Sequence, residues 1–265
     1  MNESMQGKVV IVAGGSVGIG LAVAELFAAG GANVVIAARG AERGRAAEKK
    51  IKKSGGKAFF VQTDVSKAEQ VQDLVGRTVE TFGRLDYAVN NAAVGGKIAR
   101  VGDHSEADFD AEVTANLKSV WLCMKYELEQ MEKQHPAGGA IVNTSSVNGL
   151  GGAAMAGLYS MSKAGILALT KSAAQEYAAK KIRVNALVAG GFDTELLRGA
   201  VSRMVEGDED LIRKTFDGFA AQVPAGRIGE PREAAEAAVW LCSDAASYVT
   251  GHSMIVDGGL TAWAR

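Results

Sequence analysis

The sequence predicts an α/β fold with a doubly wound parallel sheet of about seven strands and helices on both faces. Two observations lead to this prediction. Short runs rich in β-branched residues alternate with longer segments whose apolar residues recur every three or four positions. The first such run also leads directly into a glycine-rich segment. Strict alternation of strand and helix is typical of right-handed crossovers onto a parallel sheet.

Each predicted element follows from its local pattern. Seven apolar runs fit buried strands, at residues 8–13, 33–38, 58–63, 85–90, 140–145, 183–188 and 253–256. Helical spacing covers residues 18–29, 41–54, 67–82, 105–134, 156–180 and 231–243. No linker interrupts the alternation, so we expect one domain over residues 1–265. Only residues 194–226 break it, as a charged insertion that we interpret as a substrate lid.

Composition excludes several classes of protein. With 48% hydrophobic and 22% charged residues in 265, the chain is neither disordered nor fibrous. A net charge of −1 argues against binding to nucleic acid or to an anionic membrane. Two separated cysteines and three dispersed histidines predict no metal site. Without an apparent export signal or a long apolar run, we expect a cytoplasmic protein.

The glycine-rich segment predicts a dinucleotide cradle. It joins a strand to a helix, where missing side chains let a pyrophosphate approach the backbone and free N–H groups at the helix start can bind it. A tight turn without a ligand is the alternative interpretation. The residues assigned to the cradle are Gly14, Ser16, Gly18, Ile19 and Gly20.

The end of the second strand indicates which dinucleotide is bound. An acidic residue there would accept hydrogen bonds from the ribose hydroxyls of NAD(H). This chain has Ala38 followed by Arg39, and a guanidinium can pair with a 2′-phosphate. We therefore expect NADP(H) in preference to NAD(H). Stacking of Arg39 on the adenine, or a merely solvated charge, is the alternative.

A tyrosine and a lysine stand four residues apart on a predicted helix. Tyr159 and Lys163 therefore share one face, and a nearby ammonium favours the phenolate form of a tyrosine. Two serines, Ser145 and Ser146, end the preceding strand. Because side chains alternate along a strand, only one of the two can face the tyrosine.

These residues, with others, resemble the short-chain dehydrogenase/reductase family. The matching motifs are residues 13–20, Asn90-Asn91-Ala92-Ala93, Asn116, Ser146, Tyr159-x-x-x-Lys163 and Val256-Asp257-Gly258-Gly259, in order and over essentially the whole chain. The resemblance implies a Rossmann-type oxidoreductase with a nicotinamide cofactor. Three departures, at Ala13, Ala93 and Ala189, put the shape of the nicotinamide pocket in question.

The resemblance also implies the role of each catalytic residue. Tyr159 would be the general acid and base, and Lys163 would lower the tyrosine pKa and hold the nicotinamide ribose. Ser146, thirteen residues before the tyrosine as the family spacing requires, would bind the substrate oxygen, whereas Ser145 falls outside that spacing. Asn116 would hold a water that relays protons to the lysine.

Further cofactor contacts follow in the same way. Asp64 would accept from the adenine, although it could instead cap the next helix, and Thr194 would bind the carboxamide, although it could be an N-cap. The remaining cofactor residues implied are Val65, Asn91, Ala92, Gly190 and Phe192. Asn148 is the one polar anchor expected for a substrate.

The expected activity is hydride transfer between NADP(H) and a ketone or secondary alcohol. Reduction of a 3-oxoacyl thioester on an acyl carrier protein is one alternative, and a regulator that senses NADPH without turnover is another. The helix over residues 156–180 has more apolar surface than one sheet face covers, and residues 260–264 are also apolar. The family resemblance implies that such surfaces build a homotetramer.

Overall fold

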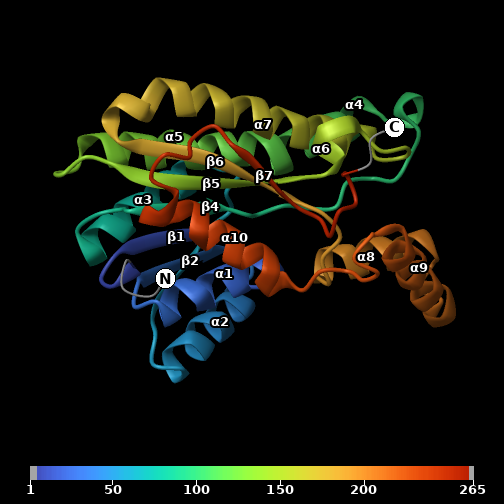
Figure 1. The fold of residues 1–265 in the computed structure, drawn as a ribbon, viewed down its shortest axis with the longest axis horizontal. Helices are drawn as coiled ribbons and strands as arrows, with labels where there is room; N and C mark the ends of the chain where they lie inside the picture. The colour runs from blue at the N-terminus through green and yellow to red at the C-terminus, as the bar shows by residue number, and fades with distance from the viewer. Residues whose placement is uncertain (1–4, 263–265) are drawn as a thin grey trace.

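The computed structural model describes residues 5–262 and contains one sheet of seven parallel strands in the order β3-β2-β1-β4-β5-β6-β7 (Figure 1). The strands are β1 Val9–Ala13, β2 Asn33–Ala38, β3 Lys57–Gln62, β4 Tyr87–Asn90, β5 Gly139–Ser146, β6 Ile182–Ala189 and β7 Ser253–Val256. All six neighbouring pairs are parallel. The predicted doubly wound parallel sheet is therefore confirmed.

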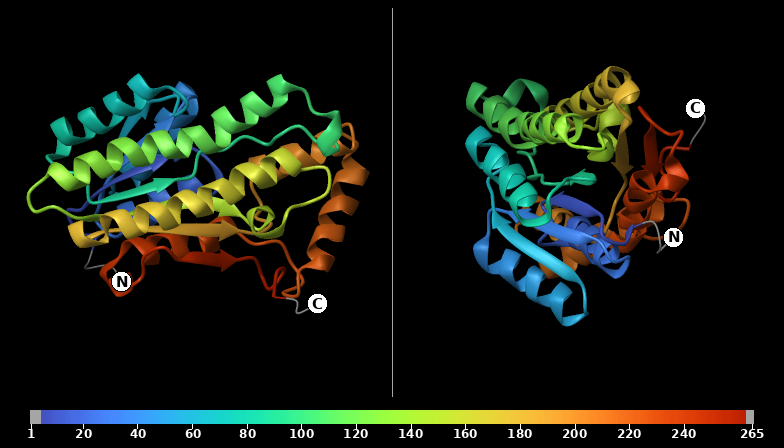
Figure 2. Two further views of the ribbon diagram at one scale, coloured as in Figure 1. Left: turned by 90° about the horizontal axis from the view of Figure 1, so that it is seen from above. Right: turned by 90° about the vertical axis from the view of Figure 1, so that its left-hand side faces the viewer.

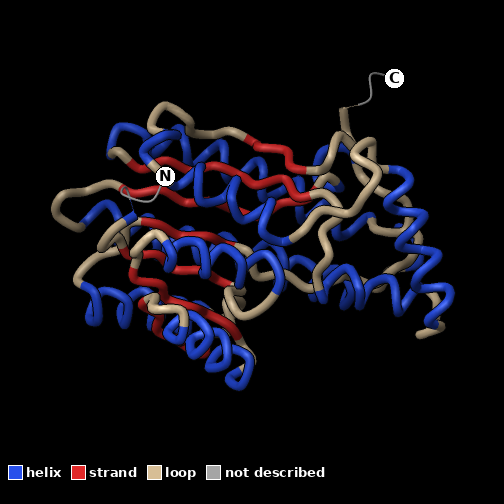
Figure 3. Tube along the Cα trace, turned by 60° about the horizontal axis from the view of Figure 1, so that its bottom comes forward, coloured by secondary structure: helices blue, strands red, loops and turns tan. Residues whose placement is uncertain are grey.

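Helices cover both faces of this sheet. One face packs against α1 (Gly18–Ala29), α2 (Ala41–Lys53) and α10 (Pro231–Cys242). The other packs against α3 (Ala68–Phe82), α5 (Ser119–Lys133) and α7 (Gly157–Tyr177), which run side by side in Figure 2. Figure 3 shows the strands in red between these two helical layers.

The central strands are apolar on both sides, as a covered parallel sheet requires. All five residues of β1 are buried. Val10 and Val12 belong to the core under α1 and α10, whereas Ile11 belongs to the core under α3, α5 and α7. The strand pattern thus gives two hydrophobic cores with the sheet between them.

The helix predicted over residues 105–134 is interrupted. It consists of α4 (Glu106–Glu112), a π-helical stretch η3 (Val113–Lys118) and then α5. A capping box between Ser105 and Asp108 starts α4. π-helical turns occur often at functional sites, and this one contains Asn116.

The segment interpreted as a lid forms two helices beyond the end of β6. α8 (Glu195–Met204) is N-capped by Thr194, and α9 (Glu209–Gln222) is N-capped by Asp208. Both project from one end of the sheet in Figure 1. Short helices complete the chain: η2 Val101–Asp103, α6 Asn148–Gly151, η4 Ala178–Lys180 and η5 Asp244–Ala246. Within residues 5–262, no helix is both long and apolar enough to cross a bilayer.

Candidate active site

The end of β5 and the start of α7 bring three predicted residues together. Ser146, the last residue of β5, lies near enough to Tyr159 for its hydroxyl to lower the pKa of the phenol. Lys163 follows one helical turn later, with Nζ 5.6 Å from the centroid of the Tyr159 ring. A hydroxyl, a phenol and an amine thus meet at the carboxyl end of the sheet, where ligands of open α/β sheets bind.

The two serines of β5 have different partners. Ser145 is buried, and its Oγ donates to the carbonyl oxygen of Lys163 at 2.8 Å. Ser145 therefore fixes α7 on the sheet, while Ser146 lies beside Tyr159, and the two serines have different neighbours as strand alternation predicts. Lys163 is also buried, and its Nζ donates to the carbonyl oxygen of Thr144 at 3.0 Å.

Burial is the largest cause of the pKa shifts of Tyr159 and Lys163. It raises the pKa of Tyr159 to about 12; the hydrogen bond from Ser146 lowers this pKa, and the charge of Glu112 raises it further. Burial also lowers the pKa of Lys163 to about 8, against the opposing effect of Glu112. Lys163 is not among the groups that shift the Tyr159 pKa here, so the lowering expected from it stays a prediction.

Asn116 uses its whole side chain to hold the loop after β4. Its Oδ1 accepts from the backbone N of Val94 at 2.9 Å, and its Nδ2 donates to the Val94 carbonyl at 3.0 Å. The same Nδ2 donates to Oε1 of Glu112 at 2.6 Å. The structure thus gives the amide a positioning role, and the water that it was expected to hold stays a prediction.

Sequence reasoning missed Glu112. Its side chain is buried beside the site and accepts hydrogen bonds from Asn116 and from Ser162 Oγ, the latter at 2.9 Å. One signal was available, because Glu112 precedes Asn116 by four residues and so shares its helix face. Its burial could not be read from the sequence, since it depends on α7 and on the loop after β4.

The glycine loop is packed so closely that side chains do not fit. Gly14 has a φ of +76°, and a Cβ there would lie 2.8 Å from the backbone N of Ala92. A Cβ at Gly20 would overlap the carbonyl oxygen of Gly14. Ala92 therefore touches the loop, while the backbone N of Asn91 donates to the Ala13 carbonyl at 3.0 Å.

The loop also fits a pyrophosphate. The N-cap of α1, Val17, makes no side-chain capping bond, and the first turn has no acidic residue. The N–H groups of Gly18, Ile19 and Gly20 are consequently without a side-chain cap at the positive end of the helix dipole. Ser16, just before this turn, is only partly buried.

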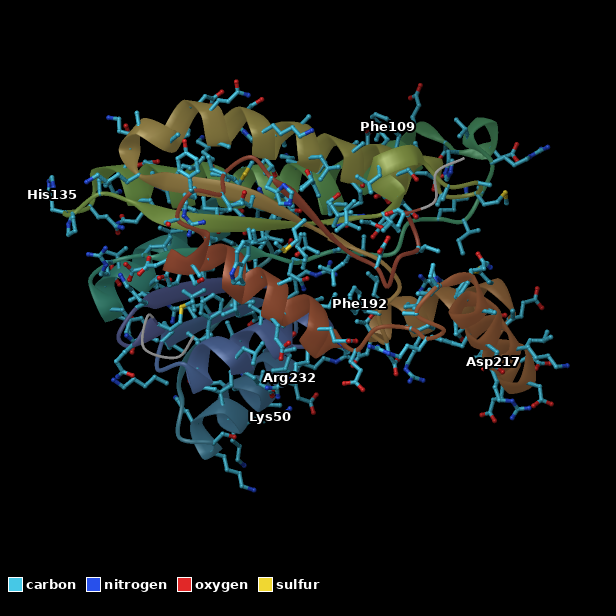
Figure 4. The ribbon with its side chains drawn as sticks, viewed as in Figure 1. Lys50, Phe109, His135, Phe192, Asp217 and Arg232 are labelled. Atoms are coloured by element: carbon cyan, nitrogen blue, oxygen red, sulfur yellow. The ribbon has the colours of Figure 1, made fainter. Side chains whose placement is uncertain are left out.

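The turn after β6 faces the glycine loop. A Cβ at Gly18 would lie 3.2 Å from Cγ2 of Thr194. Thr194 Oγ1 accepts from the backbone N of Leu197 at 3.3 Å, so the N-cap interpretation holds and leaves a carboxamide contact possible. The ring of Phe192 is buried against Gly229 near the start of α8 (Figure 4). Only the backbone atoms of Phe192 are therefore left to contact a cofactor. Gly190 packs on Asp257.

The residues expected around the adenosine lie at the ends of β2 and β3. Arg39 is exposed, and its carbonyl accepts from Gln62 Nε2 at 3.0 Å. Asp64 accepts from the backbone N of Ser66 at 3.0 Å and from its Oγ at 2.7 Å. Burial opposes ionisation of Asp64, but the Ser66 bonds and the charge of Arg39 hold its pKa below the usual value. Val65 packs beside Ala13.

Two of the sequence departures cause no strain. Neither Ala93 nor Ala189 has a positive φ, and Ala189 is the regular end of β6. Asn148 lies at the mouth of the site, where its backbone N donates to Ser146 Oγ at 3.2 Å. Across residues 5–262, no cluster of three or more His, Cys, Asp or Glu side chains is arranged to hold a metal ion.

Comparison with known proteins agrees with this geometry. Residues 13–261 match the family model described as enoyl-(acyl carrier protein) reductase. The chain is 41% identical over 260 residues to a 2,5-dichloro-2,5-cyclohexadiene-1,4-diol dehydrogenase of Sphingobium indicum, covering 98% of this chain and 99% of the relative. It is 40% identical over 261 residues to a short chain dehydrogenase/reductase of Aspergillus oryzae, covering 97% and 96%.

One solved structure has nearly the same fold as this chain. The crystal structure of a levodione reductase superimposes with a TM-score of 0.93 at 32% sequence identity. The match covers 98% of this chain and 99% of that one, so the sheet, both helical layers and the lid segment all fall within it.

Proposed function

Because the chain belongs to the short-chain dehydrogenase/reductase family of oxidoreductases, we propose that it transfers a hydride between NADP(H) and a ketone or secondary alcohol. The observation that carries the proposal is the meeting of Ser146, Tyr159 and Lys163 beside a glycine loop that fits a pyrophosphate. All three side chains that the resemblance requires at the reacting carbonyl are present and adjacent, which argues against a regulator without turnover.

The residues divide the proton chemistry among them. NADPH supplies the hydride when it is bound. Ser146 donates a hydrogen bond to the carbonyl oxygen and fixes the carbonyl carbon for attack. Tyr159 delivers the proton to the same oxygen, and takes it back from the alcohol in the reverse direction. Its raised pKa keeps the phenol protonated at neutral pH, which suits carbonyl reduction.

Arg39 supports the choice of NADP(H). Its side chain is exposed at the end of β2 and makes no ion pair with any residue of the described range. A 2′-phosphate would lie at this strand end, and its binding site needs a cation that is not already paired. Residues Ala41 to Arg43 begin α2 next to it, so helix N–H groups add to the positive field.

The substrate proposed is a neutral, partly hydrophobic ring alcohol or ketone. The relative from Sphingobium indicum is named for a cyclohexadiene diol, which supports this class. The space beside Gly95 and Gly96 in the loop facing Tyr159 is taken by Arg203 Nη2 and Glu112 Oε2, so these two glycines add no room for a ring. Exposed apolar side chains on the lid, Leu196 and Met204, are suited to cover it.

The second candidate is reduction of a 3-oxoacyl thioester on an acyl carrier protein, and a relative from Chlamydia muridarum that is 36% identical to this chain is named for that reaction. An acidic carrier would need free cations on the lid, and two of the four basic residues there are paired, Arg198 with Asp193 at 2.6 Å and Arg213 with Asp210 at 2.8 Å, which leaves Arg203 and Lys214. We therefore place this candidate second.

One assay compares the two candidates. NADPH oxidation is followed by absorbance with a panel of cyclic ketones and with acetoacetyl thioesters of pantetheine, using Tyr159→Phe as the matched control. We expect turnover of at least one ketone by the wild-type chain, and turnover about 10³-fold slower by the variant at unchanged NADPH affinity. Turnover confined to thioesters would establish the second candidate, and full activity of Tyr159→Phe would refute the assigned acid.

A homotetramer and a cytoplasmic location are further parts of the proposal. Trp121 on α5, Met161 on α7 and Ile255 on β7 are each more than a third exposed, as surfaces covered by other subunits would be in one chain. Part of the apolar C-terminus, Trp263 and Ala264, lies outside the described residues. Small-angle scattering should give the mass of four chains, and a monomer mass would contradict this.

The cysteines support the proposed location. Both cysteines, Cys123 and Cys242, are buried free thiols, as in a reducing compartment.

A further inference from the structure

A buried carboxylate stands next to the proposed catalytic pair. Glu112 ends α4, where the π-helical stretch begins, and only 5% of it is exposed. Its Oε1 accepts two hydrogen bonds, from Asn116 Nδ2 at 2.6 Å and from Ser162 Oγ at 2.9 Å. One carboxylate oxygen thus joins the helix that carries Asn116 to the helix that carries Tyr159 and Lys163.

The second oxygen points to the loop in front of Tyr159. A Cβ at Gly96 would lie 2.5 Å from Oε2 of Glu112 and 3.7 Å from Cβ of Tyr159. Oε2 therefore fills the space that a side chain at position 96 would take. The absence of a side chain at Gly96 is what lets a carboxylate approach this part of the site.

No cation bonds to this carboxylate within residues 5–262. Its hydrogen-bond donors, Asn116 on its own helical run and Ser162 on α7, are both neutral. The nearest basic residue of the loop, Lys97, is bound to Asp108 at 2.8 Å. A buried carboxylate held only by neutral donors is costly for folding, so packing alone does not account for it.

The titratable groups that face Glu112 both come from α7. Its negative charge raises the pKa of Tyr159 and of Lys163, and no other acidic side chain acts on both. The loop contributes Gly96, which has no charge. On α4, Asp108 is paired with Lys97. The charge of Glu112 therefore favours the protonated forms of the phenol and of the amine.

We propose that Glu112 is a positioning residue of this site, which holds Asn116 and Ser162 in place and sets the pH range in which Tyr159 exchanges its proton. The inference rests on the function proposed above, with Tyr159 as the acid and base. Glu112 acts through Tyr159 and Lys163 and touches neither substrate nor cofactor in this role. It keeps Tyr159 a proton donor, and so favours reduction of a carbonyl over oxidation of an alcohol near neutral pH.

The test replaces the charge and keeps the shape. In Glu112→Gln, an amide oxygen can still accept from Asn116 and Ser162. We expect the pH of half-maximal alcohol oxidation to fall by about one pH unit, because the phenolate forms more readily. In parallel, NMR of lysines labelled at Cε, with Lys163 assigned from a Lys163→Arg spectrum, should show a lower titration midpoint for Lys163 than in the wild type, because Glu112 raises the Lys163 pKa.

Two matched variants separate charge from burial. Glu127→Gln removes another buried carboxylate, on α5, and Glu106→Gln removes an exposed one on α4. Both should leave the pH profile and the Lys163 midpoint as in the wild type. If Glu112→Gln does not fold, Glu112→Met has a similar volume, needs no polar partner and is expected to show the same two shifts.

Each outcome bears on one of the two proposals. An unchanged pH profile and an unchanged Lys163 midpoint in the neutral variant would overturn the role of Glu112, even if activity fell. Equal shifts in Glu127→Gln would overturn it as well. A wild-type chain inactive on every ketone and alcohol would refute the proposed function, whereas the Lys163 midpoint would still decide whether Glu112 acts on this pair.

Discussion

The carboxyl edge of the sheet and the lid segment are held in different ways. At the edge, Ser145, Ser162 and Lys163 are buried, and each bonds to a neighbouring element. In the lid, α9 buries no residue and α8 buries only Val201. An ion pair of 2.6 Å between exposed side chains, Arg43 and Glu195, joins α8 to α2.

The difference shows where the chain needs precision. Proton transfer depends on positions fixed to a fraction of an ångström, and buried hydrogen bonds supply that at the edge. Exposed ion pairs contribute about 0 to 1 kcal/mol, so the lid can open at small cost. Substitutions of the same kind should therefore have large effects at the edge and in the sheet beneath it, and small ones in the lid.

The largest expected effect concerns Glu127, whose carboxyl group is buried beneath the carboxyl edge of the sheet. Glu127 is 1% exposed and accepts from Asn90 Nδ2 at 2.9 Å, and burial raises its pKa to about 7. Below pH 4.5 the carboxyl is protonated in both the folded and the unfolded chain. As pH rises to 7 only the unfolded chain ionises, so the wild type loses about 3 kcal/mol relative to Glu127→Gln.

Urea unfolding of both chains at several pH values checks this loss. The lid offers the control, since Glu209 on α9 is exposed and Glu209→Gln should change the unfolding free energy by less than about 0.5 kcal/mol at every pH. A constant difference between wild type and Glu127→Gln would show that the buried carboxyl does not titrate in this range.

The next effect concerns the cofactor end of the edge. Replacing Ala38 with Asp and Arg39 with Ser removes the cation and adds an acceptor for ribose hydroxyls. We expect the ratio of kcat/KM for NADPH to that for NADH to fall about 100-fold, the equivalent of one or two charge-assisted hydrogen bonds. Arg203→Ser, which removes a lid cation instead, should leave the ratio within about twofold of the wild type, and an unchanged ratio in the double variant would exclude Arg39 as the 2′-phosphate ligand.

The smallest effects come from the same substitution in the two regions. Gly14→Ala places a methyl group 2.8 Å from Ala92 at a φ of +76°, and should destabilise the chain by about 2 kcal/mol. Gly218 lies in α9 with no atom within 4 Å of the added methyl, so Gly218→Ala should stabilise it by about 0.5 to 1 kcal/mol. Thermal unfolding measures both, and two shifts of the same sign would contradict the contrast.

Local patterns predicted the sheet well. Seven strands lie at the expected positions, although β4 begins at Tyr87 rather than at residue 85. Leu85 and Asp86 are buried in the approach to this strand, where Asp86 Oδ2 accepts from the backbone N of Val9 at 2.9 Å. Hydrophobic patterns report burial and cannot tell a strand from a buried connection that bonds through a side chain.

The site was only partly predictable, because some of its geometry is tertiary. Tyr159 and Lys163 share one helix face as their spacing requires, and Ser146 joins them as the family resemblance implied. The π-helical stretch around Asn116 depends on bonds to Val94, a residue of a distant loop. No local pattern marks Glu112 as a buried acid, since its burial depends on α7 and on Gly96.

The most direct test of the account follows the hydride itself. The wild-type chain is incubated with a cyclic ketone and NADPH deuterated at the transferred position, and the alcohol is analysed by mass spectrometry. We predict deuterium on the carbinol carbon, and a rate about 10³-fold lower in Tyr159→Phe at unchanged NADPH affinity. Tight NADPH binding with no deuterium in any alcohol, or equal rates in the two chains, would contradict the account.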